Sequence, residues 1–348
     1  MCEEHSIYNQ SKPTSSNKGR KAKKRQKATN RIMDFSLIKK VLQETVPFGL
    51  REIIPSTMGE PLLYKDFKKL LKLIRKYGLK LNLTTNGTFP TLGANKWAEL
   101  IMPVASDIKV SINGADKQIA ENIMRGLNFE QQLANIQTLI KTRDNVREEG
   151  INHPTLTFQV TFMERNLPSL EDILHLGIQM DADRFKGHHV WVTNHAMEEE
   201  SLKRHPAAIQ KWNNTVDKLY SIAENHRLKN GASIQLDNIY KLKNRPNKYL
   251  TKLPNQIKST PLLPTDLICP FLGREAWIAW DGTFNVCCAP DNLRRKFGSF
   301  GNVKTRHFLE LWNSKSYSQL LTQWGNHKVC AQCNMRKPFS KSRRRSNG

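Results

Sequence analysis

The chain has 348 residues, of which 38% are hydrophobic, and it carries a formal net charge of +24. No apolar run reaches the roughly 18 residues of a membrane-spanning helix, and the polar N-terminus lacks the apolar segment of a secretory signal. We therefore expect a soluble, cytoplasmic protein without a membrane partner, large enough for one α/β domain and a smaller domain.

The positive charge is concentrated in two short segments, one between Lys18 and Arg31 and one between Arg336 and Arg345. Both are poor in apolar residues, which predicts that they are mobile in isolation. They suggest contact with nucleic acid or another acidic partner. The alternative is that both segments are merely solvated and bind no partner. This alternative is favoured by the lack of aromatic residues among the N-terminal lysines, since stacking on single-stranded nucleic acid requires them.

A regular alternation of helices and strands follows the aperiodic residues 3–31. Apolar spacing predicts helices over 33–46, 64–78, 97–105, 129–145, 169–182 and 206–231. Short apolar runs predict strands over 50–54, 79–88, 107–114, 155–163, 188–194 and 232–239. This rhythm predicts an α/β fold of parallel βαβ units, a partial (β/α)6 barrel. The pattern begins with a helix, so we expect the barrel to lack its first strand.

Composition divides the chain into five segments. They are a polar and basic N-terminal segment (1–33), the partial barrel (34–236), a linker rich in Lys, Asn and Pro (237–268), a small cysteine-rich domain (269–335) and a basic tail (336–348).

Five of the six cysteines lie in the last quarter of the chain. They are Cys2, Cys269, Cys287, Cys288, Cys330 and Cys333. An even count without a secretory signal favours metal binding over disulfides. "AWIAWDGTFNVC" predicts a β-hairpin with its turn at Asp281-Gly282, which brings Cys287 back towards Cys269. With the later CxxC, four thiolates can enclose a zinc ion or a four-iron–four-sulfur (4Fe-4S) cluster, and spacing does not separate the two.

The cysteine-rich segment resembles the SPASM-type auxiliary domain of radical S-adenosylmethionine (radical SAM) enzymes. Twelve residues separate Cys269 from Gly282, four more lead to Cys287, and a CxxC comes later. "FGNVKTRHFLELWNS" is similar to the family's Gly-Asn turn and following helix. No cysteine follows Cys333, so the resemblance implies one auxiliary 4Fe-4S cluster. Its implied ligands are Cys269, Cys287, Cys330 and Cys333, with Cys288 replacing Cys287 if the register differs by one.

The N-terminal half also resembles radical SAM enzymes, and the resemblance spans about residues 34–335. "MGEPLLYKDF" is similar to the family's Gly-Gly-Glu-Pro motif, with Met58 in place of the first Gly, and "TTNGT", "KVSINGAD" and "IMRG" match later strand ends. The implied S-adenosylmethionine-binding residues are Gly59, Glu60, Pro61, Asn86, Ser111, Asn113 and Arg125. Many relatives have Asp at position 113. An exposed loop acid explains Glu60, and a solvated cation explains Arg125, without any ligand.

The family's defining CxxxCxxC motif binds three irons of a radical 4Fe-4S cluster and leaves the fourth for S-adenosylmethionine. This sequence has no such triplet, and the resemblance places Cys2 at the third ligand position. We expect the first strand and two ligands to lie upstream, in a truncated sequence or one started at an internal Met codon. Residues 1–33 would then begin with the remnant of the cluster loop. The alternatives are a catalytically dead protein that lost this cluster and an incidental Cys2; as written, the chain is not expected to hold a stable radical cluster.

The resemblance implies reductive cleavage of S-adenosylmethionine to a 5′-deoxyadenosyl radical, which abstracts hydrogen from a peptide, protein or small-molecule substrate. An electron donor such as flavodoxin or ferredoxin is implied as well. The alternatives are an RNA-modifying radical SAM enzyme, suggested by the basic segments, and a non-catalytic iron–sulfur or zinc protein. His188, His189 and His195 lie near a late strand end, where they either line a substrate pocket or are ordinary polar residues.

Overall fold

The computed structural model describes residues 31–55, 59–150, 153–193, 195–243, 267–331, 333 and 335–338. Its central feature is a six-stranded sheet in which all neighbouring strands are parallel and follow one another in chain order. The strands are β1 (Glu52–Ile53), β2 (Lys80–Thr85), β3 (Ala105–Ser111), β4 (Thr155–Phe162), β5 (Arg184–His189) and β6 (Gln235–Asp237). Parallel strands in sequential order confirm the predicted partial (β/α)6 barrel.

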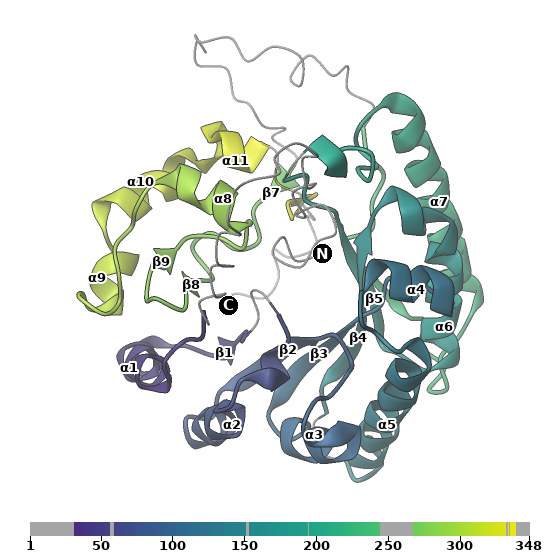
Figure 1. Ribbon diagram of the computed structural model, residues 1–348, viewed down its shortest axis with the longest axis horizontal. Coiled ribbons are helices and arrows are strands. Elements are labelled where there is room, and N and C mark those ends of the chain that lie inside the picture. The colour runs from purple at the N-terminus through teal and green to yellow at the C-terminus, as the bar shows by residue number, and fades with distance from the viewer. Residues whose placement is uncertain are drawn as a thin grey trace, which may run out of the picture.

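Helices cover the outer face of this curved sheet (Figure 1). They are α1 (Phe35–Thr45), α2 (Phe67–Lys76), α3 (Gly93–Ile101), α4 (Lys117–Ile123), α5 (Phe129–Glu148), α6 (Leu170–Gln179) and α7 (Pro206–Asn225). Short 3₁₀ turns connect some of them, namely η3 (Val46–Phe48), η4 (Pro61–Leu63), η5 (Glu164–Ser169) and η6 (His195–Met197). The described part of the barrel begins with α1 rather than with a strand, as the sequence predicts. None of the described helices is long and apolar enough to cross a membrane.

Alternation along the strands separates an apolar outer face from a polar inner face. Leu83 in β2 and Ile108 in β3 are fully buried in the main hydrophobic core, where the helices pack. Asn82 precedes Leu83, and Lys109 follows Ile108. Because neighbouring side chains of a strand alternate between its faces, both point to the opposite face, inside the barrel. There the Lys109 ammonium donates to the Asn82 side chain. The barrel thus presents a polar interior.

Strand β5 lies earlier in the chain than the predicted strand over 188–194, and that prediction is wrong in its position. The charges of Arg184 and Lys186 argue against a strand there. Inside the barrel, Arg184 pairs with Asp107 at 2.9 Å and Lys186 pairs with Asp237 at 3.1 Å. These partners come from other strands, so the sequence alone does not show that the charges are neutralised.

Helix α4 is not predicted by the apolar pattern. Its first turn is capped by Asp116, whose carboxylate accepts a hydrogen bond from the Ile119 N–H at 2.9 Å. The helix is short, with one buried residue, Ala120. Arg125 lies in the exposed loop that follows this helix.

The cysteine-rich segment forms small elements at one end of the barrel. They are β7 (Leu267–Ile268), β8 (Trp277–Ile278), β9 (Phe284–Asn285), α8 (Asp291–Arg294), η7 (Arg295–Phe297), α9 (Phe308–Trp312), α10 (Lys315–Gln323), η8 (Trp324–Asn326), α11 (Lys328–Ala331) and β10 (Lys337–Pro338). Strands β8 and β9 pair antiparallel around Asp281-Gly282, which confirms the predicted hairpin. Gly282 has φ +87°, and an added Cβ would lie 2.5 Å from the Asn302 side-chain oxygen, so this turn requires glycine.

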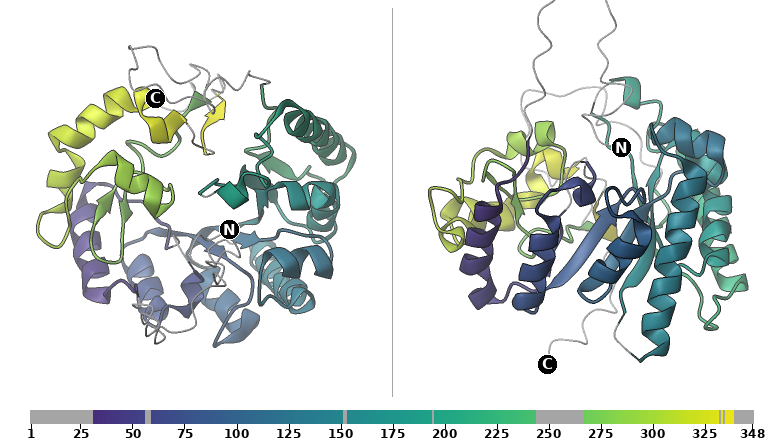
Figure 2. Two further views of the ribbon diagram at one scale, coloured as in Figure 1. Left: turned by 45° about the horizontal axis from the view of Figure 1, so that its top comes forward. Right: turned by 60° about the horizontal axis from the view of Figure 1, so that its bottom comes forward.

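Helix α1 joins the barrel to the C-terminal elements. Leu37 is buried in the same apolar cluster as Phe284, Leu311 and Tyr317. The Glu44 carboxylate accepts a hydrogen bond from the Phe308 N–H, the first residue of α9, at 2.8 Å. Figure 2 shows α1 beside the yellow-green C-terminal elements.

A second connection lies at the other end of the C-terminal segment. Strand β10 pairs antiparallel with β7, so residues 337–338, which the sequence assigns to a basic tail, are part of the fold. The Lys337 ammonium lies 2.5 Å from the carboxylate of Asp237 in β6, and the Tyr240 hydroxyl donates to the Arg336 carbonyl at 2.9 Å. The chain after the CxxC is therefore fastened to the last barrel strand.

Candidate cluster site and cofactor site

Five thiols lie around one apolar pocket. The lining cysteines are Cys269, Cys287, Cys288, Cys330 and Cys333. The first follows β7, the next two follow the β8–β9 hairpin, and the last two come from α11 and the residues after it. All five are free thiols. The structure thus brings together the four cysteines that the sequence analysis proposes as ligands, together with the spare Cys288.

Burial makes these thiols reluctant to ionise. It raises the pKa of Cys287 to about 11 and the pKa of Cys330 to about 12, and the neighbouring thiols add to the rise. Burial also raises the pKa of Cys333, and raises that of Cys288 well above its ordinary value. Thiolates at such positions need a strong local positive charge, and metal ions that bind thiolates supply it.

Basic side chains lie close to the thiols. Arg294 opposes the rise in the pKa of Cys287, and Arg336 does the same for Cys330 and Cys333. Cations around a group of thiolates offset part of their negative charge. The surroundings of the pocket are therefore suited to an anionic centre.

The donor set fits an iron–sulfur cluster. Four cysteine sulfurs in an apolar pocket are the ligands that such clusters take. The apolar wall includes Trp191, which follows β5, so the pocket adjoins the carboxyl edge of the barrel.

Glu60 is the most firmly placed of the residues proposed for S-adenosylmethionine. One carboxylate oxygen accepts from the Thr85 hydroxyl at 2.9 Å and from the Leu62 N–H at 3.2 Å, and the other accepts from the Asn86 N–H at 2.7 Å. Burial raises the pKa of Glu60 despite these donors. The carboxylate therefore ties η4 to the end of β2. Pro61 is the first residue of η4 and is buried, which suits a proline at the start of a helical turn.

The loops after β2 and β3 are joined by Gln132, which the sequence analysis does not single out. Its side-chain amide donates to the Asn86 carbonyl at 2.7 Å and to the Ser111 carbonyl at 2.9 Å. Asn135, one turn later on α5, donates to the Gly87 carbonyl at 2.8 Å. The sequence contains one signal that could have identified these two residues: both amides lie on the face of α5 that carries the buried Ile136. Helix α5 thus holds Asn86 and Ser111 together through the side chain of Gln132.

Asn113 is buried and already bonded within the chain. Its side-chain oxygen accepts from the Thr161 N–H at 2.9 Å, and its carbonyl accepts from the Asn166 side chain at 3.3 Å. This amide holds the loop after β3 to the end of β4. Asn113 therefore has a structural role at the edge where the sequence analysis places the cofactor.

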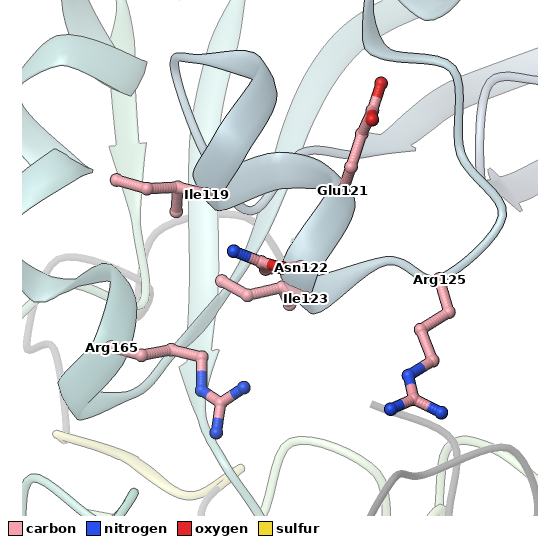
Figure 3. A pocket seen from close by; sticks show the side chains of 6 residues that line it. All are labelled: Ile119, Glu121, Asn122, Ile123, Arg125 and Arg165. Carbon is pink, nitrogen blue, oxygen red and sulfur yellow. The ribbon is translucent and has the colours of Figure 1, made fainter.

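Arg125 lies apart from this group. It is exposed on the loop after α4 and lines a pocket with Arg165 of η5. Figure 3 shows the two guanidinium groups on opposite sides of this pocket, below α4. Of the remaining predicted residues, Gly59 precedes η4 with φ +85°, and Met58 and Cys2 lie outside the described residues.

The inner face of the barrel leads towards the thiol pocket. His188, at the end of β5, interacts with the Gln159 side chain at 3.3 Å, and burial together with Lys186 lowers its pKa to about 3. Glu275, from the segment between Cys269 and β8, has one buried carboxylate oxygen without a hydrogen-bond partner among the described residues.

A group of cysteines beside the carboxyl edge of a parallel barrel is the arrangement expected of a barrel enzyme that works with an iron–sulfur cluster. Family profiles agree. Residues 15–177 match the radical SAM superfamily, and residues 269–334 match SPASM, the iron–sulfur cluster-binding domain. The chain therefore contains a radical SAM domain followed by a C-terminal SPASM domain. These families use S-adenosylmethionine with a 4Fe-4S cluster and auxiliary iron–sulfur clusters.

Known proteins resemble this chain over most of its length. The tungsten-containing aldehyde ferredoxin oxidoreductase cofactor-modifying protein of Pyrococcus furiosus is 24% identical over 87% of this chain and 80% of its own length. The solved structure of anSMEcpe with bound AdoMet and the Kp18Cys peptide has a TM-score of 0.57, with 16% identity over 87% of this chain and 78% of that one. Streptococcus suis SuiB bound to its precursor peptide SuiA has a TM-score of 0.55, with 14% identity over 86% of this chain and 64% of SuiB. The likeness to the two structures shows the fold.

Proposed function

We propose that this protein is a radical SAM enzyme that oxidises or crosslinks a peptide substrate inside its barrel. The observation that carries the proposal is the thiol pocket beside Trp191, at the carboxyl edge of the strands, where barrel enzymes place their chemistry. The peptide class is supported by SuiB and anSMEcpe, whose structures contain a precursor peptide and the Kp18Cys peptide respectively.

The roles of the chain's own residues follow from their contacts. Glu60, Asn86 and Ser111 form the edge at which S-adenosylmethionine would bind, held rigid by Gln132. When bound with a reduced cluster, S-adenosylmethionine supplies a carbon-centred radical that abstracts hydrogen from the substrate. Cys269, Cys287, Cys330 and Cys333 would hold the auxiliary cluster.

The auxiliary site is tested by metal content. After anaerobic reconstitution with iron and sulfide, Cys330→Ala and Cys333→Ala should each lose most of the iron and sulfide that the wild-type protein retains. Cys288→Ala is the matched control, because Cys288 lines the same pocket and is the spare thiol. If Cys288→Ala keeps its full iron and sulfide content, Cys287 is the ligand. If Cys288→Ala loses iron and sulfide while Cys287→Ala keeps them, Cys288 is the ligand instead. Zinc in place of iron in the wild type would contradict the cluster.

The chain as written carries only one of the three expected ligands of the radical cluster. The activity is therefore tested on a form of the protein that carries a complete CxxxCxxC motif, supplied with S-adenosylmethionine, dithionite and a synthetic peptide library. The expected result is formation of 5′-deoxyadenosine and a subset of peptides that lose two hydrogens, both detected by mass spectrometry. Glu60→Gln should reduce 5′-deoxyadenosine formation strongly, because the amide cannot accept from all three donors that hold this edge. No 5′-deoxyadenosine from a fully reconstituted protein would overturn the proposal.

A further inference from the structure

One buried cation beside the thiol pocket is incompletely bonded by the protein. Arg294 ends helix α8, and its side chain is 10% exposed. Its terminal Nη2 donates to the Asp291 carboxylate. Its Nε–H is buried and has no hydrogen-bond acceptor among the described residues. A buried donor without an acceptor is destabilising, so an acceptor beyond the described residues is expected at this position.

Helix α8 packs beside the thiol pocket. It begins three residues after Cys288, and its N–H groups at Leu293 and Arg294 donate to the Pro290 carbonyl, both at 2.9 Å. Leu293 is buried in the cluster against which Cys287 packs. Burial lowers the pKa of the guanidinium, and the nearby Cys287 and Cys288 oppose this effect, in addition to the ion pair with Asp291.

Hydrogen bonds to the sulfurs of an iron–sulfur cluster are a main determinant of its reduction potential. An N–H donor stabilises the more negative, reduced state more than the oxidised state. A positive charge acts in the same direction. A residue that provides both should hold the potential higher than the same cluster would have without it.

We propose that Arg294 positions and tunes the auxiliary cluster, donating its Nε–H to a sulfur on the Cys287 side and so raising the reduction potential. This inference rests on the proposed function only in that the pocket must hold an iron–sulfur cluster. Its consequence is that the auxiliary cluster is a better acceptor for an electron that leaves the barrel.

The experiment uses the full chain, reconstituted anaerobically, and a redox titration followed by electron paramagnetic resonance. Arg294→Gln should retain iron and sulfide but lower the midpoint potential and change the signal shape. Arg294→Lys keeps the charge but lacks the Nε–H, so its potential should fall between those of Arg294→Gln and the wild type. The matched control is Arg295→Gln, which removes the same charge from the next, exposed residue and should leave the potential unchanged.

Each outcome decides the proposal. An unchanged potential in Arg294→Gln with a full cluster would overturn it. If Arg294→Gln loses the cluster, an unshifted potential in Arg294→Lys would overturn it equally, because that variant lacks the same donor. Iron and sulfide in the wild-type protein separate this failure from failure of the cluster assignment, since a wild type with zinc or no cluster rejects the proposed function instead.

Discussion

Among single residues, Glu275 combines unusual burial with an incomplete set of partners. It reaches from the cysteine-rich segment to a position where Glu52, Lys109 and Lys186 all influence its charge. Burial and the nearby Glu52 raise its pKa, and the two lysines only partly compensate. Because one of its oxygens lacks a partner among the described residues, the ionised form of this carboxyl is disfavoured in the folded protein.

The pKa of Glu275 predicts a pH-dependent stability difference. When a carboxyl has a higher pKa in the folded protein than in the unfolded chain, its contribution to stability is fully present at pH values below the unfolded-state pKa. This contribution is lost as the pH rises through the folded-state pKa. Glu275→Gln should therefore be more stable than the wild type at pH 8, by about 1 kcal/mol or less after solvent screening, and the difference should shrink towards pH 4. Urea denaturation at both pH values measures it. Glu310→Gln, on an exposed surface of the same segment, should show no such trend; a matching trend there would refute the explanation.

Sequence spacing predicts the thiols but not the residues that support them. The CxxC and the hairpin turn are local features, so Cys330, Cys333 and Gly282 are recognisable from the amino-acid sequence alone. Gln132 and Arg294 act through contacts that depend on how α5 and α8 pack, and their sequence neighbourhoods look like ordinary helix surface. Asn113 is recognisable as an edge residue, whereas its bond to the Thr161 N–H depends on the register between β3 and β4.

At the scale of secondary structure, helix α5 is held to the amino-terminal edge of the sheet by a buried arginine. Arg143 is fully buried and pairs with Asp183 at 2.8 Å and Asp181 at 3.0 Å, and it also donates to the Asp181 carbonyl at 2.9 Å. Asp181 has φ +63°, in the left-handed region that non-glycine residues rarely adopt. The guanidinium therefore secures a strained turn between α6 and β5.

Removing this arginine should destabilise the barrel strongly. Arg143→Ala removes a partner from three carboxylates, those of Asp144, Asp181 and Asp183, and we expect a loss of about 3–5 kcal/mol in the free energy of unfolding. Arg147→Ala is the control, because Arg147 is one turn further along α5, partly exposed, and paired with Asp183 at 2.9 Å. It should cost about 1 kcal/mol or less. Equal losses in the two variants, measured by chemical denaturation, would contradict the assigned role of Arg143.

The boundaries of elements are less predictable than their order. The order of helices and strands follows from hydrophobic periodicity, and the parallel sheet confirms it. The apolar pattern places strand β5 too late because Arg184 and Lys186 find their partners on neighbouring strands, which no local pattern reveals. Composition assigns strand β10 to a basic tail because its partners, β7 and Asp237, are distant in the sequence.

At the scale of the whole molecule, two attachments fix the position of the cysteine pocket relative to the barrel. Helix α1 provides one attachment through its shared apolar core. Asp237 provides another, since its carboxylate lies between Lys186 of β5 and Lys337 of β10. Cys333 precedes this second attachment by four residues, so movement of β10 would be transmitted to the CxxC.

The lowered pKa of Asp237 predicts the pH range in which this attachment weakens. Although burial opposes ionisation, Lys186 and Lys337 hold the pKa of Asp237 at about 2. A depressed pKa contributes stability that is present above the unfolded value near 3.8 and is lost as the pH falls towards 2. We expect this contribution to be about 1–2 kcal/mol after solvent screening.

The variant Asp237→Asn removes the charge that both lysines share. Hydrogen–deuterium exchange at pH 7 should become faster in the peptide that contains residues 335–338, and the variant should lose less stability than the wild type between pH 4 and pH 2. Asp217→Asn is the control, because Asp217 pairs with Lys241 on the exposed surface and its loss should change neither measurement. Unchanged exchange in Asp237→Asn would mean that α1 and the β7–β10 pair alone hold the pocket against the barrel. Faster exchange accompanied by loss of iron after reconstitution would show that the last barrel strand also sets the geometry of the cluster site.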